Sequence, residues 1–328
     1  MTSAAVDGPA ARQPVPLPAP VVGSLSPSRA ADFKTCPLLY RFRSIDKIPQ
    51  RPTRDKLRGT VVHAVLDRLF DLPAGQRSYQ AAAALVEPEW QRLAEAGPEV
   101  TGLFADSAGT DSAGELASWL ESARRMLAGY FALEDPGRLE PAAREQLVET
   151  VLELGDGGPG LLLRGYVDRL DVASTGEVRV VDYKTGGIPR VAYEAKALFQ
   201  LKFYALVLWR TRGAVPHQLK LMYLSDRDTL TYRPDAVELE RFERTLVAVW
   251  RAIERAVQRR DFRASPSRLC DWCDHQALCP AFGGSPPPWP EDLAEPAEPA
   301  EEAPGRAGVV RPVQAGLPPR ELARMGRP

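Results

Sequence analysis

Two aspartates and a lysine near the middle of the chain have the types and spacing that metal-dependent hydrolysis requires. They lie in the segment 163–187, LRGYVDRLDVASTGEVRVVDYKTGG. Side chains alternate between the two faces of a strand, so Asp182 and Lys184 project from one face and Tyr183 from the other. Asp168 belongs to the preceding strand, and it lies beside Asp182 if the two strands pair as a hairpin.

Two adjacent carboxylates repel each other, and a hard divalent cation between them relieves that repulsion. Mg²⁺ is typically held by one or two carboxylates together with substrate phosphate and water. A lysine two residues further along can position or help to deprotonate a water, or stabilise the charge that develops on the phosphorane. The set therefore predicts metal-assisted hydrolysis of a phosphodiester bond, with Mg²⁺ or Mn²⁺ as the cofactor.

A simpler interpretation is an ion pair on an exposed strand face, which contributes under about 1 kcal/mol. Taken alone, the D…D-x-K pattern favours that interpretation. The residues before Asp182, however, include Val178, Val180 and Val181, which are typical of a buried strand. Charged residues at the end of a buried strand require a reason, and this favours a site.

Two further motifs flank this segment, GTVVH at residues 59–63 and QLKFY at residues 200–204. On a helix, Gln200 and Tyr204 lie one turn apart on the same face. With these motifs the chain resembles the PD-(D/E)XK nuclease superfamily in its RecB-like branch, which carries GxxxH, GxxDRxD, DYKTG and QxxxY in this order. The resemblance covers most of residues 24–281.

The resemblance implies a restriction-endonuclease-like core of order αβββαβ, in which a mixed sheet is flanked by helices. It also implies that a metal ion is bound by His63, Asp168, Asp182 and the backbone carbonyl of Tyr183. Lys184 is then catalytic, and Gln200 and Tyr204 position either the DNA strand or the lysine. Each residue also has an ordinary interpretation, since His63 and Tyr204 could pack in the core and Gln200 could be solvated.

Other polar residues in the same region have weaker signals. Asp171, the second acid of GxxDRxD, is expected to face away from Asp168 and to be structural, paired with an arginine. Glu149 is a possible accessory acid, although a solvated strand residue is the better interpretation. His217 and His275 lie in no catalytic motif and are given no catalytic role.

Four cysteines form a separate set, with three clustered as C-x₂-C-x₅-C and one far upstream: Cys36, Cys270, Cys273 and Cys279. This is a poor disulfide pattern, but it can provide four thiolates for a [4Fe–4S] cluster or for zinc, with His275 as a possible zinc ligand. Some RecB-like members, including AddB-type nucleases and exonucleases of CRISPR adaptation, carry such an iron–sulfur staple. Residues 28–40, SRAADFKTCPLLY, resemble the segment around their first cysteine. The resemblance favours a structural iron–sulfur cluster without a required redox step.

A basic segment precedes the first motif and predicts contact with nucleic acid. Residues 34–58 contain eight cations, Lys34, Arg41, Arg43, Lys47, Arg51, Arg54, Lys56 and Arg58, against Asp46 and Asp55. Lysine and arginine can neutralise phosphates, and the interleaved Tyr40 and Phe42 can stack on unpaired bases. A solvated loop explains the charges equally well. Nothing resembles a base-reading module, so we expect preference for a DNA structure or end.

The rest of the chain must position these residues. Spacing predicts helices over 57–72, over 78–96 with a possible break at Pro88, and after a cap at Ser112, followed by strands over 146–154, 161–172 and 177–184. A helix over 191–212, strands over 218–224 and 229–233, and a helix over 236–260 follow. This order is α/β without Rossmann alternation, and no GxGxxG or P-loop motif indicates a nucleotide cofactor.

Composition defines the boundaries of the predicted domain. The 328 residues are 44% hydrophobic and 26% charged, with net charge -1, values typical of a globular protein. Of 31 prolines, 5 lie in residues 1–22 and 11 in residues 282–328. We therefore expect disordered tails at 1–22 and 282–328 around a nuclease domain at 23–281. That domain has a helical insertion at about 75–140 and a closing iron–sulfur segment at 265–281.

The sequence thus predicts a cytoplasmic, metal-dependent DNA nuclease, with neither a membrane span nor a secretory signal. By resemblance it acts as an exonuclease on single-stranded DNA ends in repair or recombination. RecB-like nucleases are often fused to helicases; this chain has no Walker motif, so an unwinding partner would be a separate polypeptide. The alternatives are a non-catalytic DNA-binding module and an iron–sulfur protein whose redox state controls DNA affinity.

Overall fold

The computed structural model describes residues 21–104, 112–155, 159–187 and 194–290. Its centre is a six-stranded mixed sheet in the order β1-β3-β4-β5-β6, with β2 paired to β3. The strands are β1 (Val21–Leu25), β2 (Ala143–Leu152), β3 (Gly160–Val172), β4 (Val178–Lys184), β5 (Gln218–Tyr223) and β6 (Asp228–Tyr232).

β2 pairs with β3 and β3 with β4 in antiparallel orientation, so the three strands expected in this region form an antiparallel meander. Helix α7 (Glu194–Arg212) then leads to β5, which lies parallel to β4. β1 lies parallel to the first part of β3, on the same edge that β4 pairs with further along, while β2 occupies the opposite edge. β6 is antiparallel to β5. The predicted mixed α/β sheet flanked by helices is therefore confirmed, and its order agrees with a restriction-endonuclease-like core.

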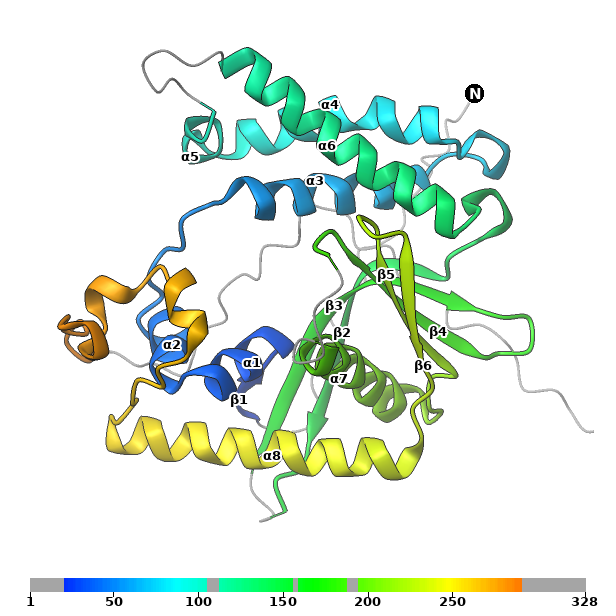
Figure 1. Ribbon diagram of the computed structural model, residues 1–328. Coiled ribbons are helices and arrows are strands. Elements are labelled where there is room, and N and C mark those ends of the chain that lie inside the picture. Colours follow the sequence, from blue (N-terminus) through cyan, green and yellow to red (C-terminus); the bar gives the residue numbers. More distant parts are fainter. Residues whose placement is uncertain (1–20, 105–111, 156–158, 188–193, 291–328) are drawn as a thin grey trace, which may run out of the picture.

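Helices cover both faces of the sheet (Figure 1). One face is covered by α3 (Arg54–Leu69) and α6 (Ser112–Leu133); α4 (Tyr79–Ala96) packs on these two helices, and α5 (Pro98–Gly102) packs on α4. The other packs against α1 (Pro27–Thr35), α2 (Pro37–Tyr40), α7 and α8 (Ala236–Arg259). Short helical turns occupy Arg41–Ile45, Ala74–Gln76, Pro136–Arg138, Arg268–Trp272, Gln276–Leu278 and Pro280–Phe282.

Strand β4 shows why the sequence reads as a buried strand. Val180 and Val181 are both fully buried, but they belong to different hydrophobic cores. Val180 packs on the side of α7 and α8, and Val181 packs on the side of α3 and α6. A strand covered on both faces needs apolar residues at consecutive positions, because neither of its sides meets water.

Several expected boundaries move. Helix α3 begins at Arg54 because the hydroxyl of Thr53 caps it by accepting the N–H of Lys56 at 3.3 Å. Helix α6 is described from Ser112, and the residues directly before it lie outside the described part of the chain, so the expected cap stays a prediction. Helix α4 continues through Pro88 without a break.

The described residues extend slightly beyond the expected domain of 23–281, since β1 starts at Val21 and the described chain continues to Pro290; the rest of the expected tails, 1–20 and 291–328, lies outside the described residues. Trp289 stacks on Phe262, and Arg41 donates a hydrogen bond to the carbonyl of Pro287. The proline count placed the boundary too early because prolines in this segment alternate with a tryptophan that packs on the core. Within the described part of the chain, no helix combines the length and apolar character that crossing a bilayer demands.

Candidate active site

The site lies where β3 and β4 separate. The pairing of these strands runs from Val172/Val178 to Arg169/Val181, and continuing that register places Asp168 opposite Asp182. There the backbone N–H of Tyr183 donates to Asp168 Oδ2 at 2.7 Å. The carboxylate of β3 thus accepts a backbone donor of β4, which holds the two aspartates on neighbouring strands as the hairpin predicts.

Lys184 links Asp182 to the helix that follows. Its Nζ lies 2.6 Å from Asp182 Oδ2 and donates to Gln200 Oε1 at 2.9 Å. The amide of Gln200 donates to the hydroxyl oxygen of Tyr204 at 3.0 Å. Gly165 on β3 permits this arrangement, because a Cβ there would lie 2.8 Å from the Tyr204 ring. The glycine of GxxDRxD and the tyrosine of QxxxY therefore depend on each other sterically.

His63 reaches the site from α3, on the opposite side of the sheet from α7. Its Nδ1 lies 3.5 Å from Asp168 Oδ2, and its ring meets the Tyr183 ring edge to face with centroids 5.9 Å apart. One turn earlier, Gly59 faces Thr185, whose Oγ1 would lie 3.1 Å from a Cβ at this position. The GxxxH motif thus brings α3 close to the end of β4, and the histidine follows from that approach.

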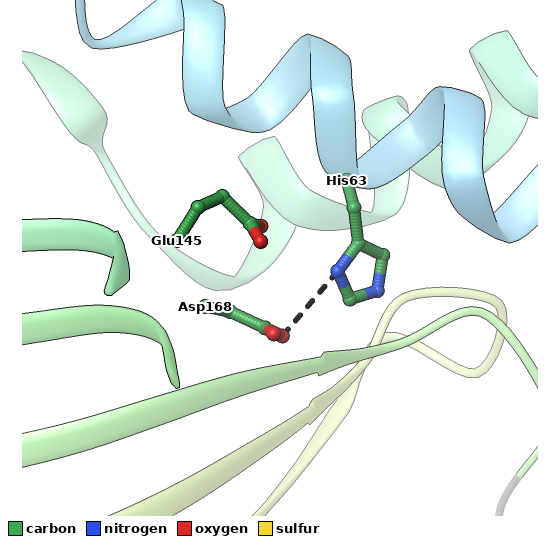
Figure 2. Close-up of side chains that lie close together, drawn as sticks. All are labelled: His63, Glu145 and Asp168. Carbon is green, nitrogen blue, oxygen red and sulfur yellow. Dashed lines mark ion pairs between the residues drawn. The ribbon is translucent and has the colours of Figure 1, made fainter. Parts of the chain in front are cut away.

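Glu145 is a site residue that sequence reasoning missed. The possible ligand atoms of His63, Glu145 and Asp168 all lie within 4.8 Å of one another, and Figure 2 shows the three side chains converging from a helix and two strands. We expected the strand to start at residue 146 and considered Glu149 instead. Glu149 pairs with Arg164 at 3.2 Å.

Burial raises the pKa of Asp168 to about 6, with a further rise caused by the Asp182 carboxylate. His63, Lys184 and the Tyr183 N–H act in the opposite direction without cancelling these effects. Desolvation disfavours the ionised form, and a second nearby carboxylate disfavours it further. The arrangement is therefore electrostatically unfavourable by itself, as expected where carboxylates are gathered to hold a cation.

Burial by itself lowers the pKa of Lys184, but the carboxylates of Asp182 and Asp168 outweigh it and raise the pKa above its usual value. The side chain is therefore an ammonium at neutral pH and holds its proton firmly. Of the roles expected for it, stabilising negative charge fits this state, whereas accepting a proton from water does not.

A buried ion pair supports both strands of the site. Arg169, 1% exposed, contacts Glu134 at the end of α6 through two hydrogen bonds of 2.6 and 3.1 Å, and donates to the Tyr183 hydroxyl at 2.9 Å. Asp171 lies 3.1 Å from Arg169 and also pairs with Arg179, which confirms the structural role expected for it. The residues next to Asp168 and Asp182 are thus anchored to the helical layer.

The cysteines meet around one cavity of about 60 Å³, which is lined by all four: Cys36, Cys270, Cys273 and Cys279. The backbone N–H of Ser265 points at Cys36 Sγ, and that of Ser267 at Cys270 Sγ, each at 3.3 Å. Among the described residues only the set around His63 brings three possible ligand atoms within 4.8 Å, so no three cysteine sulfurs approach that closely. The two ends of the domain therefore meet at the thiols.

The aromatic residues of the basic segment do not form a stacking surface. Tyr40 and Phe42 are only 3% and 1% exposed, so the expectation that they stack on DNA bases is wrong. Their hydrophobic rings fill the core on the side of α1 and α8. Four arginines are partly neutralised by acids, in the pairs Arg41–Asp46, Arg43–Asp32, Arg54–Glu115 and Arg58–Asp55.

The two remaining histidines lie outside the site. His217 Nδ1 lies 3.6 Å from the exposed Glu177. His275 is buried beside Phe42, with ring centroids 5.3 Å apart, and it does not line the cysteine cavity.

Comparison with known protein families identifies the superfamily to which this chain belongs. Residues 24–280 match the family model of the PD-(D/E)XK nuclease superfamily. The chain belongs to this superfamily, whose members cleave DNA by hydrolysis with the help of divalent metal ions.

Two phage proteins are similar over most of the chain. The Gene 69 protein of Mycobacterium phage D29 is 25% identical over 285 residues, which cover 78% of this chain and 96% of the phage protein. The Gene 69 protein of Mycobacterium phage L5 is 24% identical with the same coverage.

Two solved structures are also similar. The protein SSO0001 has 19% identity and a TM-score of 0.34, over 60% of this chain and 82% of that protein. A candidate exonuclease from Eubacterium rectale has 10% identity and a TM-score of 0.45, over 77% of this chain and 88% of that protein.

Proposed function

We propose that the chain is a Mg²⁺- or Mn²⁺-dependent deoxyribonuclease of the RecB-like branch that acts as an exonuclease on single-stranded DNA ends, in repair or recombination. The observation that carries the proposal is the fork, the point where β3 and β4 separate. Asp168, Asp182 and Lys184 lie together there, and His63 of α3 contacts Asp168. The four ordered motifs, GxxxH, GxxDRxD, DYKTG and QxxxY, support the branch.

The residues at the fork suit a hard divalent cation. Two carboxylates, an imidazole and a backbone carbonyl are available from Asp168, Asp182, His63 and Tyr183. Burial first, and then the Asp182 carboxylate, raise the pKa of Asp168, so its ionised form is disfavoured without the compensating charge that a cation would supply. When bound, such a metal supplies Lewis acidity and lowers the pKa of a bound water.

The other residues act on the DNA phosphate and on each other. Lys184, held as an ammonium, stabilises negative charge that develops on the scissile phosphate. Gln200 accepts a hydrogen bond from Lys184 and is in turn held by Tyr204, so this pair orients the ammonium. Since Gln200 uses its oxygen on the lysine and its nitrogen on the tyrosine, positioning the lysine is the role that these contacts favour.

The cysteines are proposed to hold a structural [4Fe–4S] cluster. Thiolates around a zinc ion lie about 3.8 Å apart, because each Zn–S bond is about 2.3 Å and the angles are tetrahedral. No three thiols of this chain lie within 4.8 Å of one another, and all four surround a cavity. The wider spacing favours a cluster over a single ion, and the two N–H groups directed at sulfur suit thiolate ligands.

The test is a nuclease assay on end-labelled linear single-stranded DNA with Mg²⁺, Mn²⁺ or EDTA, using protein purified without oxygen. We expect degradation that requires the metal, is lost in Asp182→Asn and persists in Asp261→Asn, which alters an exposed acid paired with Arg263. If the folded, cluster-loaded wild type binds this DNA but does not degrade it, a non-catalytic module replaces the proposal. If oxidation changes DNA affinity while Asp182→Asn does not, the redox-regulated module replaces it.

A further inference from the structure

Glu145 lies beside the candidate site in a position that suggests a role in it. In continuous register, Arg144 pairs with Arg169 and Gln146 with Val167, which places Glu145 directly across from Asp168. Glu145 has a backbone φ of 43°, in the left-handed region that non-glycine residues rarely adopt. Strained backbone conformations cluster at functional sites, and this one lies within a strand and faces a proposed metal ligand.

The three side chains lie near enough for one metal ion to gather their ligand atoms, and His63 Nδ1 is 3.5 Å from Asp168 Oδ2. A six-coordinate Mg²⁺ with bonds of about 2.1 Å has neighbouring ligand atoms about 3 Å apart and opposite ones about 4.2 Å apart. The ligand atoms of His63, Glu145 and Asp168 all lie within 4.8 Å of one another. Asp182 is outside this group and instead has its Oδ2 2.6 Å from Lys184.

The charges and the origins of the three residues are also suitable. The carboxylates of Glu145 and Asp168 together balance the charge of a divalent cation. The three ligands come from α3, β2 and β3, so an ion bound there would join the helical layer to two strands. His63 and Asp168 keep side-chain exposures of 20% and 13%, which leaves the set accessible to an ion and its waters.

We propose that Glu145 is a direct ligand of the metal ion that His63 and Asp168 hold. The inference rests on the proposed function and adds a third carboxylate to its metal centre. It means that the strand before the GxxDRxD motif contributes to the site.

The test measures Mn²⁺ binding without DNA, by titration calorimetry and by the electron paramagnetic resonance signal of free Mn²⁺. The variants are Glu145→Gln and the matched control Glu149→Gln, which changes the same residue type on the same strand but pairs with Arg164. Loss of a residue that only supports a ligand costs about 10–100-fold in metal affinity. We therefore expect Glu145→Gln to weaken Mn²⁺ binding at least about tenfold and Glu149→Gln to leave it unchanged.

A second measurement separates loss of binding from a folding defect. It is the rise in melting temperature that Mn²⁺ causes in each variant, relative to the melting temperature of the same variant without metal. The rise should be smaller in Glu145→Gln than in wild type and Glu149→Gln. If wild type and Glu145→Gln bind Mn²⁺ equally well, the inference fails and the proposed metal dependence stands. If wild type binds no Mn²⁺, both fail.

Discussion

Neutralising Asp168 is expected to stabilise the metal-free protein while it abolishes the proposed activity. The pKa of Asp168 is raised to about 6, mainly by burial and then by Asp182, whereas an unfolded chain has an aspartate pKa of about 3.9. The difference of about two pH units corresponds to about 3 kcal/mol at 1.36 kcal/mol per unit. Asp168→Asn keeps an oxygen that can accept the N–H of Tyr183, so the backbone contact is retained.

The sign follows from proton binding in the two states. Below about pH 4 the carboxyl is protonated in both the folded and the unfolded state, so it does not lower the free energy of unfolding. Between about pH 4 and 6 the unfolded chain has lost the proton and the folded chain keeps it, so the ionised carboxylate increasingly favours unfolding. Above about pH 6 both are ionised and the cost stays constant. The gain from Asp168→Asn is therefore about 3 kcal/mol at pH 8 and about half of that at pH 5.

The assay is urea unfolding of wild type and Asp168→Asn with EDTA at about pH 5 and about pH 8, alongside thermal unfolding. A gain of about 3 kcal/mol corresponds to a melting temperature about 5 °C higher for a domain of about 270 residues. Addition of Mn²⁺ should reverse the order, because it stabilises only the form that binds it. A variant that is less stable than wild type at pH 8, or a gain independent of pH, would refute the electrostatic argument.

Three further changes test other parts of the structure. Gly129→Ala would place a Cβ 1.9 Å from a backbone carbonyl and should lower the free energy of unfolding, measured with urea, by about 3 kcal/mol. Gly102→Ala is the control, because open space surrounds that position. Equal stability of the two variants would contradict the packing argument. Glu134→Gln leaves the buried charge of Arg169 underpaired and should lower the free energy of unfolding by about 3 kcal/mol; an unchanged urea midpoint would argue against this anchor. Cys270→Ser should reduce both the iron and sulfide bound per chain and the melting temperature, whereas full retention of the cluster in single variants of all four cysteines would exclude them as its ligands.

Much of the fold was predictable because periodicity is a local property. The strand expected over 177–184 is β4 at Val178–Lys184, and the helix expected over 236–260 is α8 at Ala236–Arg259. Alternation also placed Asp182 and Lys184 on one face, where the structure has them 2.6 Å apart. These predictions succeed because they depend only on residues that are near one another in the sequence.

Features that depend on distant segments were missed or misread. Tyr40 and Phe42 looked like exposed aromatics because their neighbours in sequence are basic, yet α8 and the core cover them. Trp289 lies among prolines, and its packing is seen only in the structure, where it contacts Phe262, Arg41 and Arg260. Glu145 carries no motif, and its nearness to the site comes from the pairing of β2 with β3 and the approach of α3.

The sequence by itself determined the class of chemistry, because acids, a lysine and cysteines at motif spacing restrict what a chain can bind. Tertiary structure decided which of these side chains meet. The register of β3 against β4 and the glycine contacts of α3 and α7 brought His63, Asp168 and Lys184 together. It also added Glu145, because a ligand set is defined by distances between atoms, and those distances arise only when separate strands and helices pack.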